Sequence, residues 1–259
     1  MIDQTLYCVV GGQGSVAVAF YKQTGEEKWS NLSAGEPGYC PPTLINHAGV
    51  DQLLIWHPES LNSLNPETGE VYWSVPMRPA YGMSITAPQK QDDLLYVSAI
   101  GNLAVLMQLT DDKPEVEVLW SGGGKTGVRS ANVTPHMEPG VLFGVDCETS
   151  ALTAVSLADG ERLWESQQPT VGDDSRARHG TAFITKHEPT GNYVLFNEQG
   201  DLITAKLTAD GYEETGRQNV LEPTSSAFGR PVIWTTPAFA DRCVYVRNDK
   251  EVVCVDLPN

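Results

Sequence analysis

The chain has few basic residues. Its 17 lysines and arginines stand against 33 aspartates and glutamates, so the formal net charge is −16. A strongly acidic protein repels the phosphates of nucleic acids and the anionic headgroups of membranes. The composition therefore predicts that neither nucleic acid nor an anionic membrane surface is a partner.

Long apolar runs and linkers are also missing. No apolar stretch approaches the length of a membrane-spanning helix, and no run of Pro, Gly and Ser is longer than a loop. We therefore predict a single domain over residues 1–259 without membrane insertion. The first expected strand begins within a few residues of Met1, so we expect no signal peptide in this chain.

The cysteines and histidines lack the spacing of a metal site. A two-residue turn at Asn248-Asp249 would place Cys243 directly opposite Cys254, which allows a disulfide in an oxidising compartment. The alternative is that these two cysteines are small buried apolar residues of one sheet. The residues concerned are Cys8, Cys40, Cys147, Cys243 and Cys254, with His47, His57, His136, His179 and His187.

Tryptophan, in contrast, recurs at nearly equal intervals. Trp29, Trp73, Trp120 and Trp164 lie 44, 47 and 44 residues apart, and three of them end the phrases AFYKQTGEEKW, SLNPETGEVYW and AVSLADGERLW. Each phrase is typical of a strand, a tight turn with glycine, and a second strand. At this offset the indole can lie over the neighbouring repeat and donate its N–H to a carbonyl. We predict that the four tryptophans are structural docking residues.

Prolines mark a second recurring position. Pro42, Pro88, Pro135 and Pro237 lie 46, 47 and 102 residues apart. Proline suits the start of a strand whose N–H has no ladder partner. One more strand lies between the two markers, so a repeat of about 45 residues contains four short antiparallel strands, here A to D. This is the size and content of a β-propeller blade.

The predicted fold class is therefore all-β, a β-propeller of four-stranded antiparallel blades. Six blades can be traced, at about residues 1–30, 41–73, 87–120, 132–164, 181–217 and 235–259. The first lacks a strand A and the last lacks a strand D. The fifth has Thr215 at the docking position and keeps an Asp210-Gly211 turn. We expect these blades to be part of an eight-bladed ring; the alternative is six blades that close among themselves.

The A-x-[DN]-x-x-T-G-x-x-x-W phrase resembles the repeat of the quinoprotein alcohol dehydrogenase-like (PQQ-like) propellers. This superfamily includes the non-enzymatic, BamB-like lipoproteins of the outer-membrane assembly machine. RHGTAF at 178–183 and TPAFA at 236–240 are similar to segments of the exported PQQ-like repeat proteins of planctomycete-type bacteria. The resemblance implies a propeller that recognises proteins in the periplasm or cell envelope.

The enzymes of this superfamily hold pyrroloquinoline quinone (PQQ) and Ca²⁺ beside a catalytic Asp, usually with a disulfide between adjacent cysteines. This chain has no adjacent cysteines and no Asp or Glu in a matching setting. We therefore expect no PQQ, no Ca²⁺, no other metal and no catalytic residues. The alternatives are a PQQ-dependent dehydrogenase-like enzyme, a hydrolase that uses the funnel, or a propeller that binds a small ligand.

The loops from strand D of one blade to strand A of the next open around the funnel of a propeller. Here they are residues 31–40, 74–86, 121–131, 165–180 and 222–234, with six basic and five acidic residues, so they carry +1 against −17 elsewhere. Arginine presents a planar fork of donors that suits carboxylates. We predict that a protein or an anionic ligand binds this funnel face; the alternative is that the arginines pair locally with loop carboxylates and carbonyls. The candidate residues are Tyr39, Arg78, Tyr81, Arg129, Arg178, His179, Arg230 and Trp234.

Overall fold

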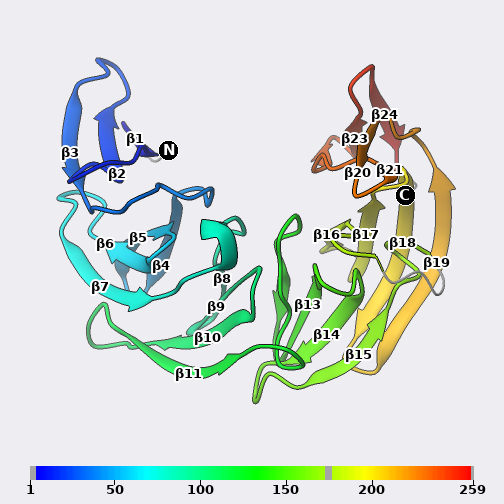
Figure 1. The fold of residues 1–259 in the computed structure, drawn as a ribbon, viewed down its shortest axis with the longest axis horizontal. Coiled ribbons are helices and arrows are strands. Elements are labelled where there is room, and N and C mark those ends of the chain that lie inside the picture. The colour runs from blue at the N-terminus through cyan, green and yellow to red at the C-terminus, as the bar shows by residue number, and fades with distance from the viewer. Residues whose placement is uncertain (1–3, 173–176, 258–259) are drawn as a thin grey trace. The chain divides into compact units, whose positions relative to one another are not determined.

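The computed structural model describes residues 4–172 and 177–257, and over these ranges the chain is built from antiparallel strands (Figure 1). The predicted all-β class is confirmed. Within the same ranges the one helical turn is η1 (Ala80–Gly82), and no helix is long and apolar enough to span a bilayer. Asp173, Asp174 and Arg176 of the predicted funnel loops lie outside the described residues.

The strands follow one another with short connections. They are β1 (Thr5–Val9), β2 (Ala17–Tyr21), β3 (Glu27–Asn31), β4 (Thr43–His47), β5 (Val50–His57), β6 (Ser60–Leu64), β7 (Val71–Pro76), β8 (Gln89–Gln91), β9 (Leu94–Ala99), β10 (Leu103–Leu109), β11 (Val116–Gly122), β12 (His136–Glu138), β13 (Val141–Val145), β14 (Leu152–Ser156), β15 (Arg162–Ser166), β16 (Ala182–His187), β17 (Asn192–Asn197), β18 (Asp201–Thr208), β19 (Gly211–Asn219), β20 (Ser225–Ala227), β21 (Arg230–Val232), β22 (Ala238–Ala240), β23 (Cys243–Arg247) and β24 (Val252–Asp256).

Each sheet follows chain order, as a blade does (Figure 1). Four-stranded sheets are formed by β4–β7, β8–β11, β12–β15 and β16–β19, and three-stranded sheets by β1–β3 and β22–β24. These six sheets coincide with the repeats traced in the sequence. The hairpin β20–β21 is additional and lies in the predicted funnel loop 222–234, where no strand is expected from the sequence.

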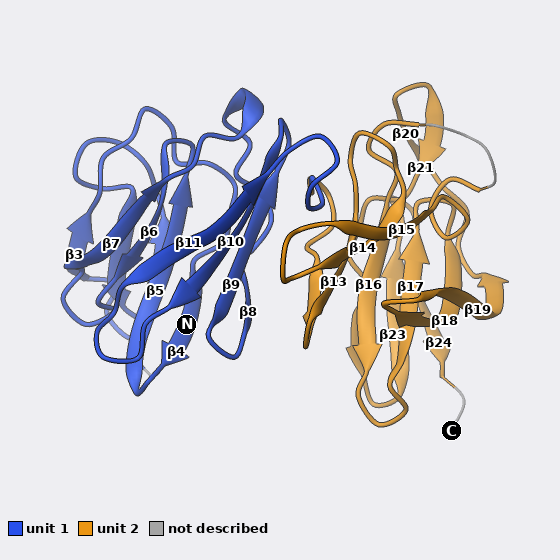
Figure 2. Ribbon diagram, turned by 90° about the horizontal axis from the view of Figure 1, so that it is seen from below, with its two compact units in different colours: residues 1–129 blue, residues 130–259 orange. Residues whose placement is uncertain are grey.

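The chain divides into two compact units, residues 1–129 and residues 130–259 (Figure 2). Unit 1 contains the first three sheets. Unit 2 contains the last three sheets and the β20–β21 hairpin. The single domain and the ring size stay predictions.

Four of the A strands begin on the residue after a proline. Because proline has no N–H to donate to a ladder, it marks the last position before pairing begins. The prolines are Pro42 before β4, Pro88 before β8, Pro135 before β12 and Pro237 before β22.

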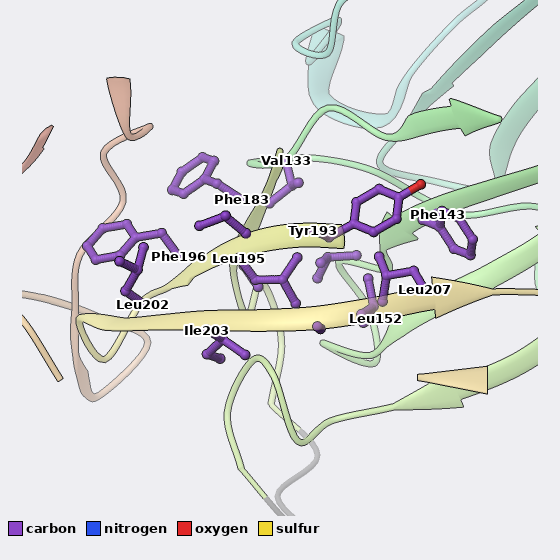
Figure 3. Packing of buried hydrophobic residues seen from close by; sticks show 14 of the residues in the cluster. Val133, Phe143, Leu152, Phe183, Tyr193, Leu195, Phe196, Leu202, Ile203 and Leu207 are labelled. Atoms are coloured by element: carbon purple, nitrogen blue, oxygen red, sulfur yellow. The ribbon is translucent and has the colours of Figure 1, made fainter. Parts of the chain in front are cut away.

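The core of unit 2 lies between its sheets (Figure 3). Phe143 of β13, Tyr193 of β17 and Ile203 of β18 belong to one buried cluster that also includes Val244 of β23. The rings of Phe143 and Tyr193 meet edge to face with centroids 5.6 Å apart. The core is thus an interface between successive sheets, as a repeat protein requires.

Trp29 joins the first two sheets of unit 1. Its Nε1 donates to the carbonyl of Pro66 at 3.0 Å, in the turn between β6 and β7. Its ring covers Gly69 of the same turn, so a Cβ added to Gly69 would lie 2.6 Å from Trp29 Cε3. Trp164 makes the matching contact in unit 2, where its Nε1 donates to the carbonyl of Thr208 at 2.8 Å. At these two positions, a tryptophan on strand D of one sheet therefore packs on the C–D turn of the following sheet.

Trp73 is buried in the same way but has another acceptor. Its Nε1 donates to Gln52 Oε1 at 3.0 Å, within its own sheet. The following sheet turns through TDDKPE at 110–115, which lacks the glycine of the repeated phrase. A side-chain amide takes the place of the turn carbonyl.

A β-bulge stands directly before the docking position in every described C–D pair. In β2–β3 the register shifts between Ala19 and Phe20, so that Ala19 faces Trp29. In β18–β19 it shifts between Thr204 and Ala205, so that Thr204 faces Gly216. Gly216 therefore occupies the docking position of the fifth blade, and the prediction of Thr215 is wrong by one residue.

The turn of the fifth blade is also displaced. Thr208 pairs with Gly211, so the two turn residues are Ala209 and Asp210 rather than Asp210-Gly211. A two-residue turn replaces the four-residue turn of the first blade, and counting four residues from Gly211 consequently misses the docking position.

The predicted pairing of Cys243 with Cys254 is wrong. In β23–β24, Cys243 faces Asp256 and Tyr245 faces Cys254. The turn spans four residues because Asn248 Oδ1 accepts the N–H groups of residues 250 and 251. Cys243 is half-buried and Cys254 exposed, so the alternative of two buried residues is wrong as well; both thiols are free.

Candidate functional site

Four of the predicted funnel residues belong to unit 1 and four to unit 2. Unit 1 contains Tyr39, Arg78, Tyr81 and Arg129. Unit 2 contains Arg178, His179, Arg230 and Trp234.

Two loops of unit 1 present tyrosine rings to solvent. The N–H of Tyr39 donates to the carbonyl of Ser84 at 2.9 Å, which ties the two loops together. Tyr39 is 66% exposed and Tyr81 is 84% exposed. Arg78 is exposed in the same loop as Tyr81, and Arg129 is half-buried after β11.

In unit 2 the predicted residues gather around Glu198. This side chain is 1% exposed in the turn between β17 and β18. Arg230 approaches it with two nitrogens, Nε at 2.6 Å from Oε1 and Nη2 at 3.2 Å from Oε2. Trp234 Nε1 donates to Oε2 at 3.2 Å. A buried carboxylate with a bidentate arginine and an indole donor fixes the base of the β20–β21 hairpin.

Glu198 is not among the residues predicted from the sequence, because it lies outside the D–A loops. Glu198 belongs to a B–C turn, NEQGD at 197–201. Asn197 Oδ1 accepts the N–H groups of Gln199 and Asp201 there. Asp146 and Asn248 accept the same kind of bonds in the sheets before and after. An Asn or Asp every 51 residues at the end of strand B was the available signal.

Arg178 and Arg230 also lie together. Arg230 Nη2 donates to the carbonyl of Arg178 at 2.9 Å. The guanidinium Nε of Arg178 lies 3.6 Å from Glu148 Oε2, and its side chain is 73% exposed. Both arginines therefore have a local carboxylate, but only Arg178 keeps its guanidinium at the surface.

Three rings form an aromatic cluster beside these charges, namely His179, Phe228 and Trp234. His179 stacks on Phe228 with centroids 4.9 Å apart and planes at 16°. Phe228 meets Trp234 at 6.1 Å and 45°. Phe228 is 66% exposed and Trp234 36% exposed, so the cluster is open to solvent. Burial lowers the pKa of His179 below its ordinary 6.5, and the neutral ring is favoured.

Two exposed rings, Tyr81 and Phe228, and the half-buried ring of His179 belong to residues with positive φ. The φ angles of Tyr81, His179 and Phe228 are 59°, 57° and 50°. The left-handed region costs a bulky residue roughly 1–2 kcal/mol. Phe228 and Gly229 form the turn of β20–β21, a place where Asn-Gly is favoured. Such strain in a surface loop points to a use of the side chain.

A hollow of about 310 Å³ adjoins Trp234 between β20–β21 and the β23–β24 turn; we call it the hairpin hollow. Asp249 lies in it and accepts the hydroxyl of Thr224 at 3.1 Å and the hydroxyl of Ser225. The lining residues are Thr224, Ser225, Ser226, Ala227, Val232, Ile233, Trp234, Thr235, Asn248 and Asp249.

His57 and Ser60 lie within hydrogen-bonding distance of each other in unit 1. His57 Nδ1 accepts the N–H of Glu59 at 3.3 Å, so its Nε2 carries the proton and donates toward Ser60 Oγ at 3.2 Å. That tautomer cannot take a proton from Ser60. Across residues 4–172 and 177–257, no three His, Cys, Asp or Glu side chains converge as a metal site needs.

The structure is similar to several solved structures. BamB from Moraxella catarrhalis matches with a TM-score of 0.65 and 15% identity, over 98% of this chain and 70% of that chain. A europium-containing methanol dehydrogenase matches with a TM-score of 0.60 and 11% identity, over 96% of this chain and 60% of that one. A functionally unknown protein from Desulfotomaculum acetoxidans DSM 771 gives 0.59 and 10% identity, over 98% and 79%. At these identities the likeness shows the fold alone.

No curated protein matches the chain. The family model described as outer membrane protein assembly factor BamB, however, matches residues 57–259. Three observations agree. The sheets follow chain order as blades do, Trp29 and Trp164 each contact the C–D turn of the next sheet, and the family model matches most of the sequence. The chain belongs to the BamB-like family of PQQ-like β-propeller proteins.

Proposed function

We propose that this protein is a non-catalytic β-propeller that recognises a protein partner in the cell envelope. The observation that carries the proposal is the set of rings at positive φ in the D–A loops, namely exposed Tyr81 and Phe228 and half-buried His179. Rigid aromatic residues supply large contact area at low entropic cost. The family model, described as an assembly factor, supports both the binding role and the envelope location.

An anionic group of the partner would meet the exposed arginines. Arg78 is exposed in unit 1, and Arg178 in unit 2 has one carboxylate at 3.6 Å. Arg230 is bound by buried Glu198 through Nε and Nη2 and holds the hairpin. We therefore propose that the contacts with carboxylates are made by Arg78 and Arg178.

The proposal also includes the absence of PQQ and Ca²⁺ from the functional state. It is supported by the missing cluster of three metal-binding side chains among the described residues. Addition of PQQ and Ca²⁺ to the purified protein should leave the quinone absorbance as in buffer. A stoichiometric, saturable spectral change would favour the dehydrogenase-like alternative.

The binding role is tested with the immobilised full chain and an envelope extract of the source organism, followed by affinity measurement on the purified partner. Tyr81→Ala and Phe228→Ala, made separately and together, should weaken binding at least tenfold because each removes a large exposed ring. Arg178→Ala should weaken it less and make it less sensitive to salt.

Tyr21→Ala is the matched control, since Tyr21 is an exposed ring on β2 outside the D–A loops. Equal affinity for the unaltered protein and for every variant at Tyr81, Phe228 and Arg178 would reject the proposed binding role of these loops.

A further inference from the structure

The hairpin hollow offers hydrogen-bond acceptors, while all of its side-chain donors except the hydroxyl of Ser226 are engaged. The hydroxyls of Thr224 and Ser225 donate hydrogen bonds to Asp249, and the hydroxyl of Thr235 donates to the carbonyl of Arg247 at 2.6 Å. The amide of Asn248 donates to the carbonyl of Glu222 at 2.9 Å. A ligand that fits this hollow must therefore bring most of the donors.

The hollow also carries a single negative charge. Asp249 is the one ionisable residue of the lining. Hydrogen bonds from Ser225 and then Thr224 hold the pKa of Asp249 below its ordinary value, so it is ionised at neutral pH. Both hydroxyls bind Oδ2, and the charge of Arg247 also acts on this carboxylate. The hydroxyls keep one carboxylate oxygen in place and leave the other for a ligand.

The remaining wall is apolar. Val232 and Ile233 are 3% exposed, and the ring of Trp234 stands beside them with its N–H already bound to Glu198. A tryptophan ring next to a carboxylate suits an ammonium or guanidinium group through the attraction of the cation to the ring. The aliphatic stem of such a side chain packs on the apolar wall while its charged end reaches the carboxylate.

We propose that the hairpin hollow binds the side chain of a lysine or arginine from the partner protein. The proposal rests on the proposed function, because the hollow shares Trp234 with the aromatic cluster. A volume of about 310 Å³ is at the lower end of the range for ligand pockets, roughly 300–1,000 Å³, and accommodates a single side chain. The charge of Asp249 favours a basic side chain as the occupant.

The cation site can be tested without the partner. The full chain is titrated with Nα-acetyl-lysine amide and Nα-acetyl-arginine amide while the indole N–H signal of Trp234, assigned with Trp234→Phe, is followed by NMR. Both probes should shift this signal in a saturable way. Nα-acetyl-norleucine amide has the same stem without the charge, and Nα-acetyl-glutamate amide has the opposite charge; neither should bind.

Asp249→Asn keeps an acceptor for the two hydroxyls and removes the charge, and it should weaken both cationic probes at least fivefold. Asp210→Asn removes an exposed carboxylate from the β18–β19 turn and is the matched control, with no change expected. Equal binding of the norleucine probe, or full binding to Asp249→Asn, would overturn the cation site.

The two proposals fail separately. Loss of partner binding in Asp249→Asn, with the Asp210→Asn variant unchanged, is the expected result for the cation site. If the probes bind as expected but Tyr81→Ala and Phe228→Ala leave the partner affinity unaltered, the proposed face is rejected and the cation site stands.

Discussion

Gly69 is the residue at which the turn and the interface between sheets meet. Its φ of +75° is one that L side chains avoid, so glycine is needed for the turn itself. The indole of Trp29 covers the position that a Cβ of residue 69 would occupy, so glycine is also needed for the packing of Trp29 on the turn. Gly25 has the same place in the turn of the first sheet, with φ +73°, and nothing lies within 4 Å of its added Cβ.

Alanine substitutions at these two glycines distinguish the stability lost by straining the turn from the stability lost by displacing Trp29. Gly25→Ala should lower the free energy of unfolding by about 1–2 kcal/mol, the cost of a side chain at positive φ. Gly69→Ala should lower it by a further 1–3 kcal/mol or so, because the methyl group displaces Trp29. Urea unfolding of both variants measures the difference, and equal losses would contradict the packing of Trp29 on the turn.

At the scale of elements, sequence predicted the strands well and their register poorly. The repeated phrase and the prolines mark where strands begin and turn, because glycine and proline have strong backbone preferences. A β-bulge leaves no such mark, since it inserts one residue without changing composition. Gly216 was missed because the fifth blade has a two-residue turn where the first blade has a four-residue turn, and Cys243 was misplaced because Asn248 widens its turn.

The candidate site was predictable only in its loops. Arg178, His179, Arg230 and Trp234 do lie together, yet the residue that organises them, Glu198, belongs to another class of turn. Glu198 and Arg230 are 32 residues apart in the sequence. Their contact depends on how two sheets pack, and a local sequence pattern does not show this.

The β20–β21 hairpin should depend on the charge of Glu198. Glu198→Gln keeps the shape and an acceptor for Trp234 but leaves Arg230 without its buried carboxylate. Breaking such a pair costs about 3 kcal/mol. Glu148→Gln removes the carboxylate of exposed Arg178 and should cost about 0–1 kcal/mol. Thermal unfolding distinguishes the two, and similar losses would show that Glu198 does not anchor the hairpin.

At the scale of the whole molecule, several groups make the fold sensitive to acid. Burial lowers the pKa of His57 and of His179 below 6.5. Burial acts to raise the pKa of Asp201, but hydrogen bonds from Asn219 and Arg217 hold it below its ordinary value. In each case the unfolded chain binds protons more readily than the folded protein does, so folding is favoured at higher pH.

The free energy of unfolding should therefore fall in two stages as the pH decreases. The first loss begins below about pH 6.5, where unfolded histidines gain protons, and the second begins near pH 4, where unfolded carboxylates do. Urea midpoints at pH 7.5, 5.5 and 4 measure both stages. His57→Gln with His179→Gln should flatten the first stage and leave the second; a midpoint that rises between pH 7.5 and 5.5 would contradict the assignment.

The contact of Trp29 and of Trp164 with the following turn has a consequence for how such a chain can grow by duplication. Trp29 and Gly69 lie in different sheets, as do Trp164 and Thr208. A copied segment that begins and ends with one sheet would separate an indole from its carbonyl at the junction. A segment from one D strand to the next C–D turn would carry both partners. The segment that keeps each pair together is therefore offset from the blade by one strand of four, and grafts between relatives should be cut between the C–D turn and strand D.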